Sequence, residues 1–353
     1  MSDPMMIIFT IRQALPPLEA AITFGAALFA LSWVVPRRIV LLPPSGRRGA
    51  TLVWAGVAGS VLVVAVATVV SWIAASSQDV SGFDGWWRRP APLVAAAIVV
   101  AVAGIALRAV PLPAPGERAI APRRPWNAFA PRTLVWITGI LAGALALTAL
   151  WQIAIATTAP EDGTFFGNVP EHTDLPIYMP FNSGFGYIGG VGWPNQLAML
   201  IALACAGAAF VVALRADANR PMFARSSASS IRVERELTAR MFTLILFGGL
   251  VTTLGAEWMH AGSIGQATVG LDQEWISENV STTRVYVGSG YDAFARPMNL
   301  LGYFLQAAGV AFLLRLAVDT ARAARAARAA GRVRLASSGI DPVGQDAHVG
   351  TAR

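Results

Sequence analysis

Seven apolar runs, each about as long as a membrane-crossing helix, dominate this sequence. A helix needs roughly 20 apolar residues to cross a hydrocarbon core of about 30 Å. Hydrophobic residues make up 55% of the chain and charged residues only 13%, too little polar surface for a soluble globule of 353 residues. The sequence therefore predicts an all-α integral membrane protein with a seven-helix bundle over residues 18 to 318. The predicted spans are about 18–35, 51–74, 91–110, 133–156, 195–214, 238–258 and 297–318.

The arginines are distributed unevenly over the gaps between these runs. The chain has 27 arginines and no lysine, and 22 of the arginines fall in alternate gaps. Basic residues stay on the cytoplasmic side of a membrane because translocating them is costly. We therefore expect a multi-pass plasma-membrane protein with the N-terminus outside and the C-terminus in the cytoplasm. The use of arginine in place of lysine throughout, with abundant alanine, glycine, valine and proline, indicates a GC-rich bacterial genome. The net charge of +7 follows from this topology and does not indicate nucleic-acid binding.

Two gaps on the outer side are long, at residues 159 to 194 and 259 to 296, and both are rich in glycine, proline and aromatic residues. Long loops in a compact protein usually have a function or are disordered, and the aromatic residues argue against disorder. We expect the two loops to form a small extracytoplasmic cap, with a short strand at Val285 to Val287. Residues 1 to 17 are predicted to form an extracytoplasmic or interfacial segment.

The C-terminal region is basic and rich in alanine. Residues 319 to 335 are predicted to form a cytoplasmic helix whose arginines contact anionic lipid headgroups. Alternatively, these arginines only stop translocation of the seventh span. Residues 336 to 353 are predicted to be a disordered tail. The predicted headgroup-contacting residues are Arg322, Arg325, Arg328 and Arg332.

Several chemistries are excluded by the residues that the chain lacks. Without lysine, the chain has neither a P-loop nor a retinal Schiff base. Gly184, Gly186 and Gly189 match the spacing G-x-G-x-x-G, but they lie in an outer loop and follow no convincing strand. A single cysteine, Cys205, excludes an internal disulfide and a cysteine-cluster metal site. The sequence predicts no catalytic residue, no metal site and no cofactor, and it gives no positive sign of an enzyme.

The candidate ligand-binding residues all lie on the predicted outer side. Imidazole and carboxylate groups occur in both outer loops, and Glu19 and Glu257 are the acids closest to apolar runs. Two interpretations are open for these two acids: solvation at the headgroup level, or a shared outward-facing site. Solvated loop charge is likewise the alternative for the histidines. The candidates are Glu19, His172, Asp174, Glu257 and His260.

Three functions remain compatible with the sequence. The first hypothesis is a membrane component of a transport or export system, whose energy comes from a separate ATPase or other membrane subunit. The second is an extracytoplasmic sensor or membrane scaffold, in which the cap binds a ligand and the cytoplasmic helix relays or docks. The third is an outward-facing membrane enzyme that uses acids and histidines of the two large loops. The expected partners are the bilayer, its cytoplasmic anionic headgroups and the separate subunit of the first hypothesis.

Overall fold

A computed structural model describes the chain at residues 17–34, 39–40, 42, 46–76, 85–118, 123–158, 163, 165–166, 174–181, 186–190, 192–221, 223, 227–272 and 284–338. The predicted tail at 336 to 353 and the segment 1 to 17 lie almost entirely outside these residues.

The protein is mostly helical. Within the described residues, six helices are long and apolar enough to cross a membrane, one of them formed jointly by α3, η2 and α4. The helix at the first predicted span, α2, is shorter, with 15 residues. The helices are α2 (Pro17–Leu31), α3 (Arg47–Trp54), α4 (Ser60–Ser76), α5 (Ala91–Arg108), α6 (Arg132–Ile155), α7 (Trp193–Ala218), α8 (Ala228–Gly265) and α9 (Asp292–Ser338), with short turns η1 (Ser32–Val34), η2 (Ala55–Gly59) and η3 (Pro115–Glu117).

Two helices extend well beyond the apolar runs that predicted them. The N-terminus of α8 is capped by Ser227, whose hydroxyl accepts a hydrogen bond from the Ser230 backbone N–H at 3.2 Å. α9 is continuous for 47 residues and carries Pro297 near its N-terminus. Hydropathy marks only the apolar middle of such helices, whereas helical hydrogen bonding continues into their polar ends.

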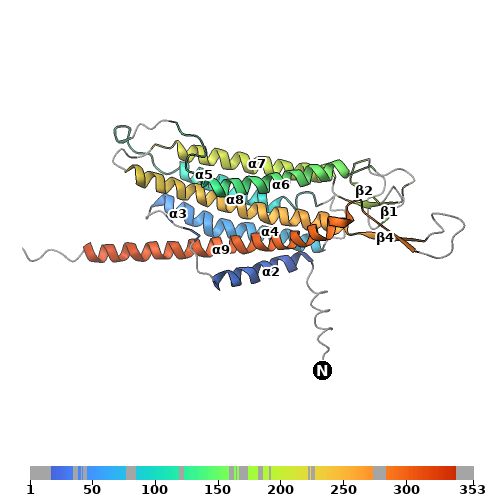
Figure 1. The fold of residues 1–353 in the computed structure, drawn as a ribbon. Coiled ribbons are helices and arrows are strands. Elements are labelled where there is room, and N and C mark those ends of the chain that lie inside the picture. The colour runs from blue at the N-terminus through green and yellow to red at the C-terminus, as the bar shows by residue number, and fades with distance from the viewer. Residues whose placement is uncertain are drawn as a thin grey trace, which may run out of the picture.

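α8 is the central helix of the bundle, and α9 packs closely along it (Figure 1). The two backbones approach at glycines two helical turns apart on α8, Gly255 and Gly262. A Cβ at Gly255 would lie 2.2 Å from the Gln306 backbone nitrogen, and one at Gly262 would lie 2.4 Å from that of Asn299. Small residues permit this approach, and close packing is a main source of helix association in lipid.

A π-helical turn, η2, joins α3 to α4 within one continuous helix. Its glycines allow close contacts on two sides, because a Cβ at Gly56 would lie 2.6 Å from Thr320 Oγ1 and one at Gly59 would lie 2.4 Å from Val99 Cγ1. By contrast, Gly139 and Gly143 of α6 have no neighbouring atom within 4 Å of an added Cβ.

Within the part of the chain that the structure describes, five short strands form two small sheets. β1 (Phe165–Phe166) pairs in parallel with β3 (Gly186–Gly189), and β2 (Tyr178–Phe181) pairs antiparallel with β3. β4 (Thr268–Asp272) and β5 (Arg284–Gly288) form an antiparallel hairpin in which Val269 lies opposite Val287. The strand predicted at Val285 to Val287 is confirmed as part of β5.

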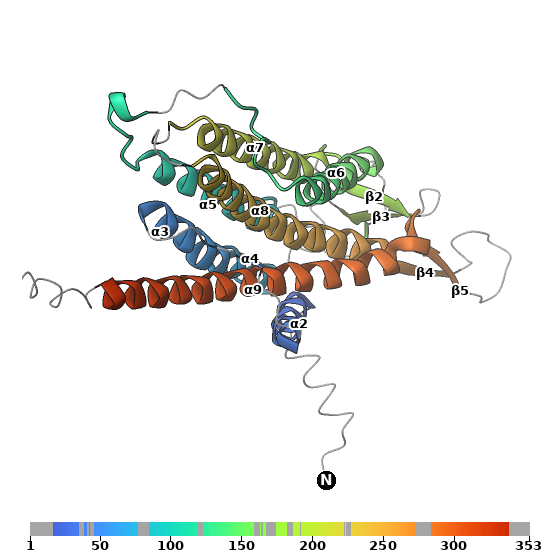
Figure 2. The ribbon, with the colours of Figure 1, turned by 60° about the vertical axis from the view of Figure 1, so that its left-hand side comes forward.

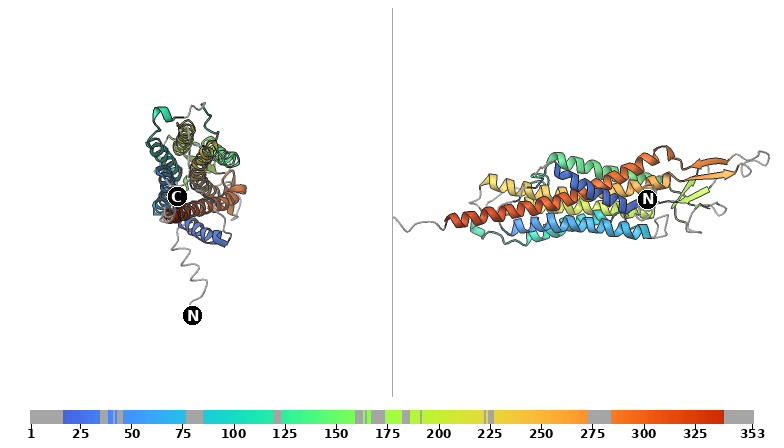
Figure 3. Two further views of the ribbon diagram at one scale, coloured as in Figure 1. Left: turned by 90° about the vertical axis from the view of Figure 1, so that its left-hand side faces the viewer. Right: turned by 90° about the horizontal axis from the view of Figure 1, so that it is seen from below.

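The bundle is elongated, and its two ends differ (Figures 2 and 3). All five strands lie at one end, which we call the cap end. The last turns of α9 extend from the opposite end, where α5 and α7 finish and α6 and α8 begin (Figure 1). We call this second end the basic end, because Arg48, Arg108, Arg215, Arg235 and Arg328 lie there.

Candidate functional site

An acidic side chain lies fully buried near the cap end of the central helix. Glu257 is on α8, two turns before the helix ends at Gly265, and its exposed fraction is 0%. An ionised carboxylate without water is stable only if charged or hydrogen-bonding partners surround it. The prediction of solvation at the headgroup level is therefore wrong for Glu257.

Two partners from other parts of the bundle hold this carboxylate. The Gln196 side chain, in the first turn of α7, donates a hydrogen bond from Nε2 to Glu257 Oε1 at 2.5 Å. Arg89, in the turn before α5, places Nη1 3.6 Å from Oε2. The Glu257 side chain is 1% exposed, whereas that of Arg89 is 14% exposed. Arg89 thus compensates the buried charge from a position that is closer to the surface.

Further polar groups surround this pair. The Tyr291 hydroxyl donates to the Ala261 backbone oxygen at 2.9 Å. Burial raises the pKa of the Tyr291 phenol above its ordinary value, the nearby Gln152 side chain lowers it, and the nearby Glu257 carboxylate raises it. Tyr291 thus remains a protonated donor at neutral pH. We call the residues Arg89, Gln152, Gln196, Glu257 and Tyr291 the Glu257 cluster.

The other predicted site residues are only partly brought together. His260 lies on α8, one turn after Glu257, and not in a loop as predicted. Its Nε2 is buried and has no hydrogen-bond partner among the described residues, so the interpretation as solvated loop charge is wrong for it. Asp174 is exposed, and its backbone oxygen accepts a hydrogen bond from Thr158 Oγ1 at 3.3 Å. His172 lies outside the described residues, and Glu19 lies in the first turn of α2, where its side chain is not described.

The predicted headgroup-contacting arginines all lie on α9, which continues the seventh apolar run without a break. Arg325 and Arg328 are exposed. Arg322 lies over the Trp33 ring, with its guanidinium carbon 3.8 Å from the ring centroid, and Arg315 lies over the same ring at 3.6 Å. The side chain of Arg332 is not described.

Sequence reasoning missed the partners of Glu257. It looked for charged residues inside the apolar runs and passed over amides, although Gln152 and Gln196 interrupt the fourth and fifth runs. Arg89 lies in a gap between two apolar runs and was not among the candidate residues. The available signal was the set of glutamines in otherwise apolar helices, since buried polar groups in a membrane protein require partners.

This arrangement can bind a proton or a cationic group. Arg89 compensates the charge of the buried carboxylate, and a cation arriving from the cap end would compete with Arg89 for Oε2. Among the described residues, no three His, Cys, Asp or Glu side chains lie close enough to hold a metal ion.

The chain matches no known family model, no curated protein and no solved structure. The class of protein therefore rests on the fold and the site alone. Among the described residues, six long apolar helices, with a buried carboxylate between parts of the bundle, define a multi-pass helical membrane protein.

Proposed function

We propose that this chain is a membrane component of a transport or export system that takes its energy from a separate ATPase subunit. The carrying observation is Glu257, a fully buried acid held by side chains from two other parts of the bundle. Ionisable residues are costly inside a membrane and usually mark an ion, proton or substrate path. The chain itself lacks the lysine of a P-loop, which supports an external source of energy.

Within this proposal, Arg89 controls access to the buried carboxylate. Arg89 is the more exposed partner and lies beside Trp86 and Trp87, which are exposed large apolar residues suited to a membrane interface. A proton or a cationic group of the solute enters from the cap end and replaces Arg89 at Glu257. Gln196 holds the carboxylate in place during the exchange.

The test combines partner capture with one matched substitution. The tagged full chain is purified from its native membranes in several mild detergents, and ATP hydrolysis is measured after reconstitution into vesicles. We expect an ATPase subunit to co-purify, and Glu257→Gln to keep this subunit while changing its hydrolysis rate. Glu236→Gln is the control, because Glu236 is 43% exposed and its ion pair is with Arg232 of its own helix. A chain that purifies alone in every detergent contradicts the proposal.

We further propose a plasma-membrane protein in which α2 is a seventh span, the N-terminus and the cap end face outward, and the basic end is cytoplasmic. The arginine distribution supports this orientation. The test uses a Cys205→Ser background with a single new cysteine at Asp174 or at Ala329, which are exposed at opposite ends. A membrane-impermeant maleimide should label intact cells only at position 174. Labelling at position 329 alone would reverse the orientation.

The continuity of α9 favours a second candidate, an extracytoplasmic sensor. This helix begins immediately after Tyr291 and runs for 47 residues, about 70 Å at 1.5 Å per residue, which is more than twice the thickness of a hydrocarbon core. A change at the Glu257 cluster would reach the cytoplasm through one rigid element. Deleting residues 322 to 335 separates the candidates: if membrane insertion and the cellular phenotype are both unchanged, signalling through this helix is wrong.

A further inference from the structure

A cavity at the basic end is lined by guanidinium groups from separate parts of the chain. It has a volume of about 560 Å³, within the usual range for ligand sites, and the described residues that line it include five arginines and no acid. These arginines come from four places: the C-terminal turn of α5, the loop before α6, the last turn of α7 and the segment just after α7. These residues, which we call the arginine pocket, are Arg108, Arg123, Arg124, Arg215 and Arg220.

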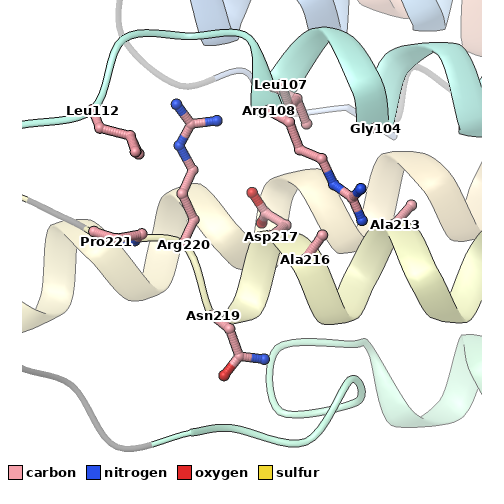
Figure 4. Close-up of a pocket in the computed structure, with 10 residues that line it drawn as sticks. All are labelled: Gly104, Leu107, Arg108, Leu112, Ala213, Ala216, Asp217, Asn219, Arg220 and Pro221. Carbon is pink, nitrogen blue, oxygen red and sulfur yellow. The ribbon is translucent and has the colours of Figure 1, made fainter.

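A second cavity of about 290 Å³ adjoins this pocket and shares Arg108 and Arg220 with it (Figure 4). Its other walls are mainly apolar, including Leu107, Leu112 and Ala213. Leu112 is 48% exposed, so an apolar surface continues outward from the cavity. The combined site thus has a strongly basic part and an apolar part side by side.

The one acid at this site is already neutralised. Asp217 lines the smaller cavity, and its Oδ2 lies 2.8 Å from Nη2 of Arg48, which lines neither cavity. Within the described part of the chain, no acid forms an ion pair with Arg108, Arg123 or Arg215. Among the described residues, Arg108, Arg123 and Arg215 therefore carry positive charge that no ion pair with an acid neutralises.

Hydrogen bonds fix the backbone that carries these arginines. The Asn219 side chain bridges the backbone of Arg124, accepting from its N–H at 2.8 Å and donating to its oxygen at 3.0 Å. Arg235 is 3% exposed and donates to the backbone oxygens of Ala218 and Arg220. These bonds hold the backbone at Arg124 and Arg220 in place, so little backbone entropy is lost there when a ligand binds.

The pKa of Arg220 reflects the concentration of positive charge at this site. Burial and the nearby Arg48 guanidinium lower the pKa of Arg220, while Asp217 raises it. Concentrated positive charge of this kind is relieved by an anion. Guanidinium groups match phosphate oxygens especially well, because they can donate two parallel hydrogen bonds.

We propose that the arginine pocket binds a phosphate group. The adjoining apolar cavity, with Leu112 exposed beside it, favours an anionic phospholipid as the source, with its phosphate at the arginines and its glycerol and acyl parts along α5 and α7. A free phosphate compound is the other source of the same chemistry. The exposed arginines Arg325 and Arg328 of α9 line neither of these two cavities and serve as the comparison.

The test compares two double variants that each remove two exposed positive charges. Arg108→Gln with Arg215→Gln alters the pocket, and Arg325→Gln with Arg328→Gln alters the α9 extension. The full chain in neutral detergent is titrated with phosphatidylglycerol, with phosphatidylcholine and with inorganic phosphate, and bound molecules are counted by native mass spectrometry. We expect saturable phosphatidylglycerol binding that the pocket variant weakens by about 30-fold, at about fivefold per arginine, while the α9 variant is unchanged.

Each result of these titrations either supports or overturns the proposed phosphate site. Selective phosphatidylglycerol binding that is lost only in the pocket variant supports a lipid phosphate, and pocket-dependent binding of inorganic phosphate supports a soluble source. Equal loss in both double variants shows general attraction to basic charge and overturns the proposal. The absence of saturable binding to the wild-type chain also overturns the proposal. Thermal unfolding is measured on the wild type and both double variants to show that all three are folded.

Discussion

Adding one methyl group at Gly255 should separate the two most closely packed helices of the bundle. The new Cβ would lie 2.2 Å from the Gln306 backbone nitrogen, 2.7 Å from its Cα and 2.8 Å from its Cβ. Ordinary contact needs about 3.5 Å, so α8 and α9 must move apart by roughly 1 Å. The clashing atoms are mostly backbone, which cannot rotate away as a side chain end can.

The same separation affects contacts on both sides of Gly255. A Cβ at Gly302 of α9 would lie 2.3 Å from the Met259 nitrogen, so the close approach continues along the interface. Overpacking typically costs about 1–3 kcal/mol and occasionally more. We expect Gly255→Ala to lower the free energy of unfolding by about 3 kcal/mol, since two rigid backbones meet here and packing is a main force between helices in lipid.

Gly139→Ala is the matched control, because nothing lies within 4 Å of its added Cβ. Alanine has the higher helix propensity, so this variant should be unchanged or more stable by up to about 1 kcal/mol. Both proteins are unfolded by heat or denaturant in the same detergent and followed by circular dichroism. If Gly255→Ala matches the wild type within about 0.5 kcal/mol, the inferred close contact between α8 and α9 is refuted.

Three further predictions concern charges and the single thiol. Arg315→Met leaves the buried Asp319 without its 3.3 Å ion pair and should lower stability by about 3 kcal/mol, and adding Asp319→Leu should restore most of the loss in the same unfolding assay. Asp217→Asn removes the charge that Arg48 contacts at 2.8 Å and should cost about 2 kcal/mol; an unchanged unfolding midpoint would contradict this. Cys205 is exposed on a span, so it should face lipid and react slowly with maleimide in intact membranes but rapidly after denaturation, because thiolate does not form in hydrocarbon. Equal rates in the two states would place it in water.

The sequence predicted the class of fold well because hydropathy reports directly on membrane crossing. Among the described residues, each of the six long helices coincides with one apolar run or contains it, although α2, at the first run, is shorter than the others. The pairing of these helices could not be predicted. In a membrane protein both the lipid-facing and the protein-facing sides of a helix are apolar, so periodicity does not separate them.

The candidate site was predicted only in part for a related reason. Glu257 and His260 stood out as rare ionisable residues near an apolar run, but their burial depends on where α8 ends. Gln196 and Arg89 lie far from Glu257 in the sequence, and only the packing of α7 and the turn before α5 against α8 brings them together. Contacts of this kind leave no local pattern in one sequence.

The π-helical turn at Ala55–Gly59 sets the rotational phase of the helix that contains it. Removing one residue there would restore the ordinary α-helical period and turn everything before it by about 100° relative to α4. Arg48 would then point away from both Asp217 and Thr238, which its Nη2 contacts at 2.8 and 2.7 Å. Shortening a lipid-embedded segment by one residue would thus break an ion pair at the basic end, although neither residue of that pair had been altered.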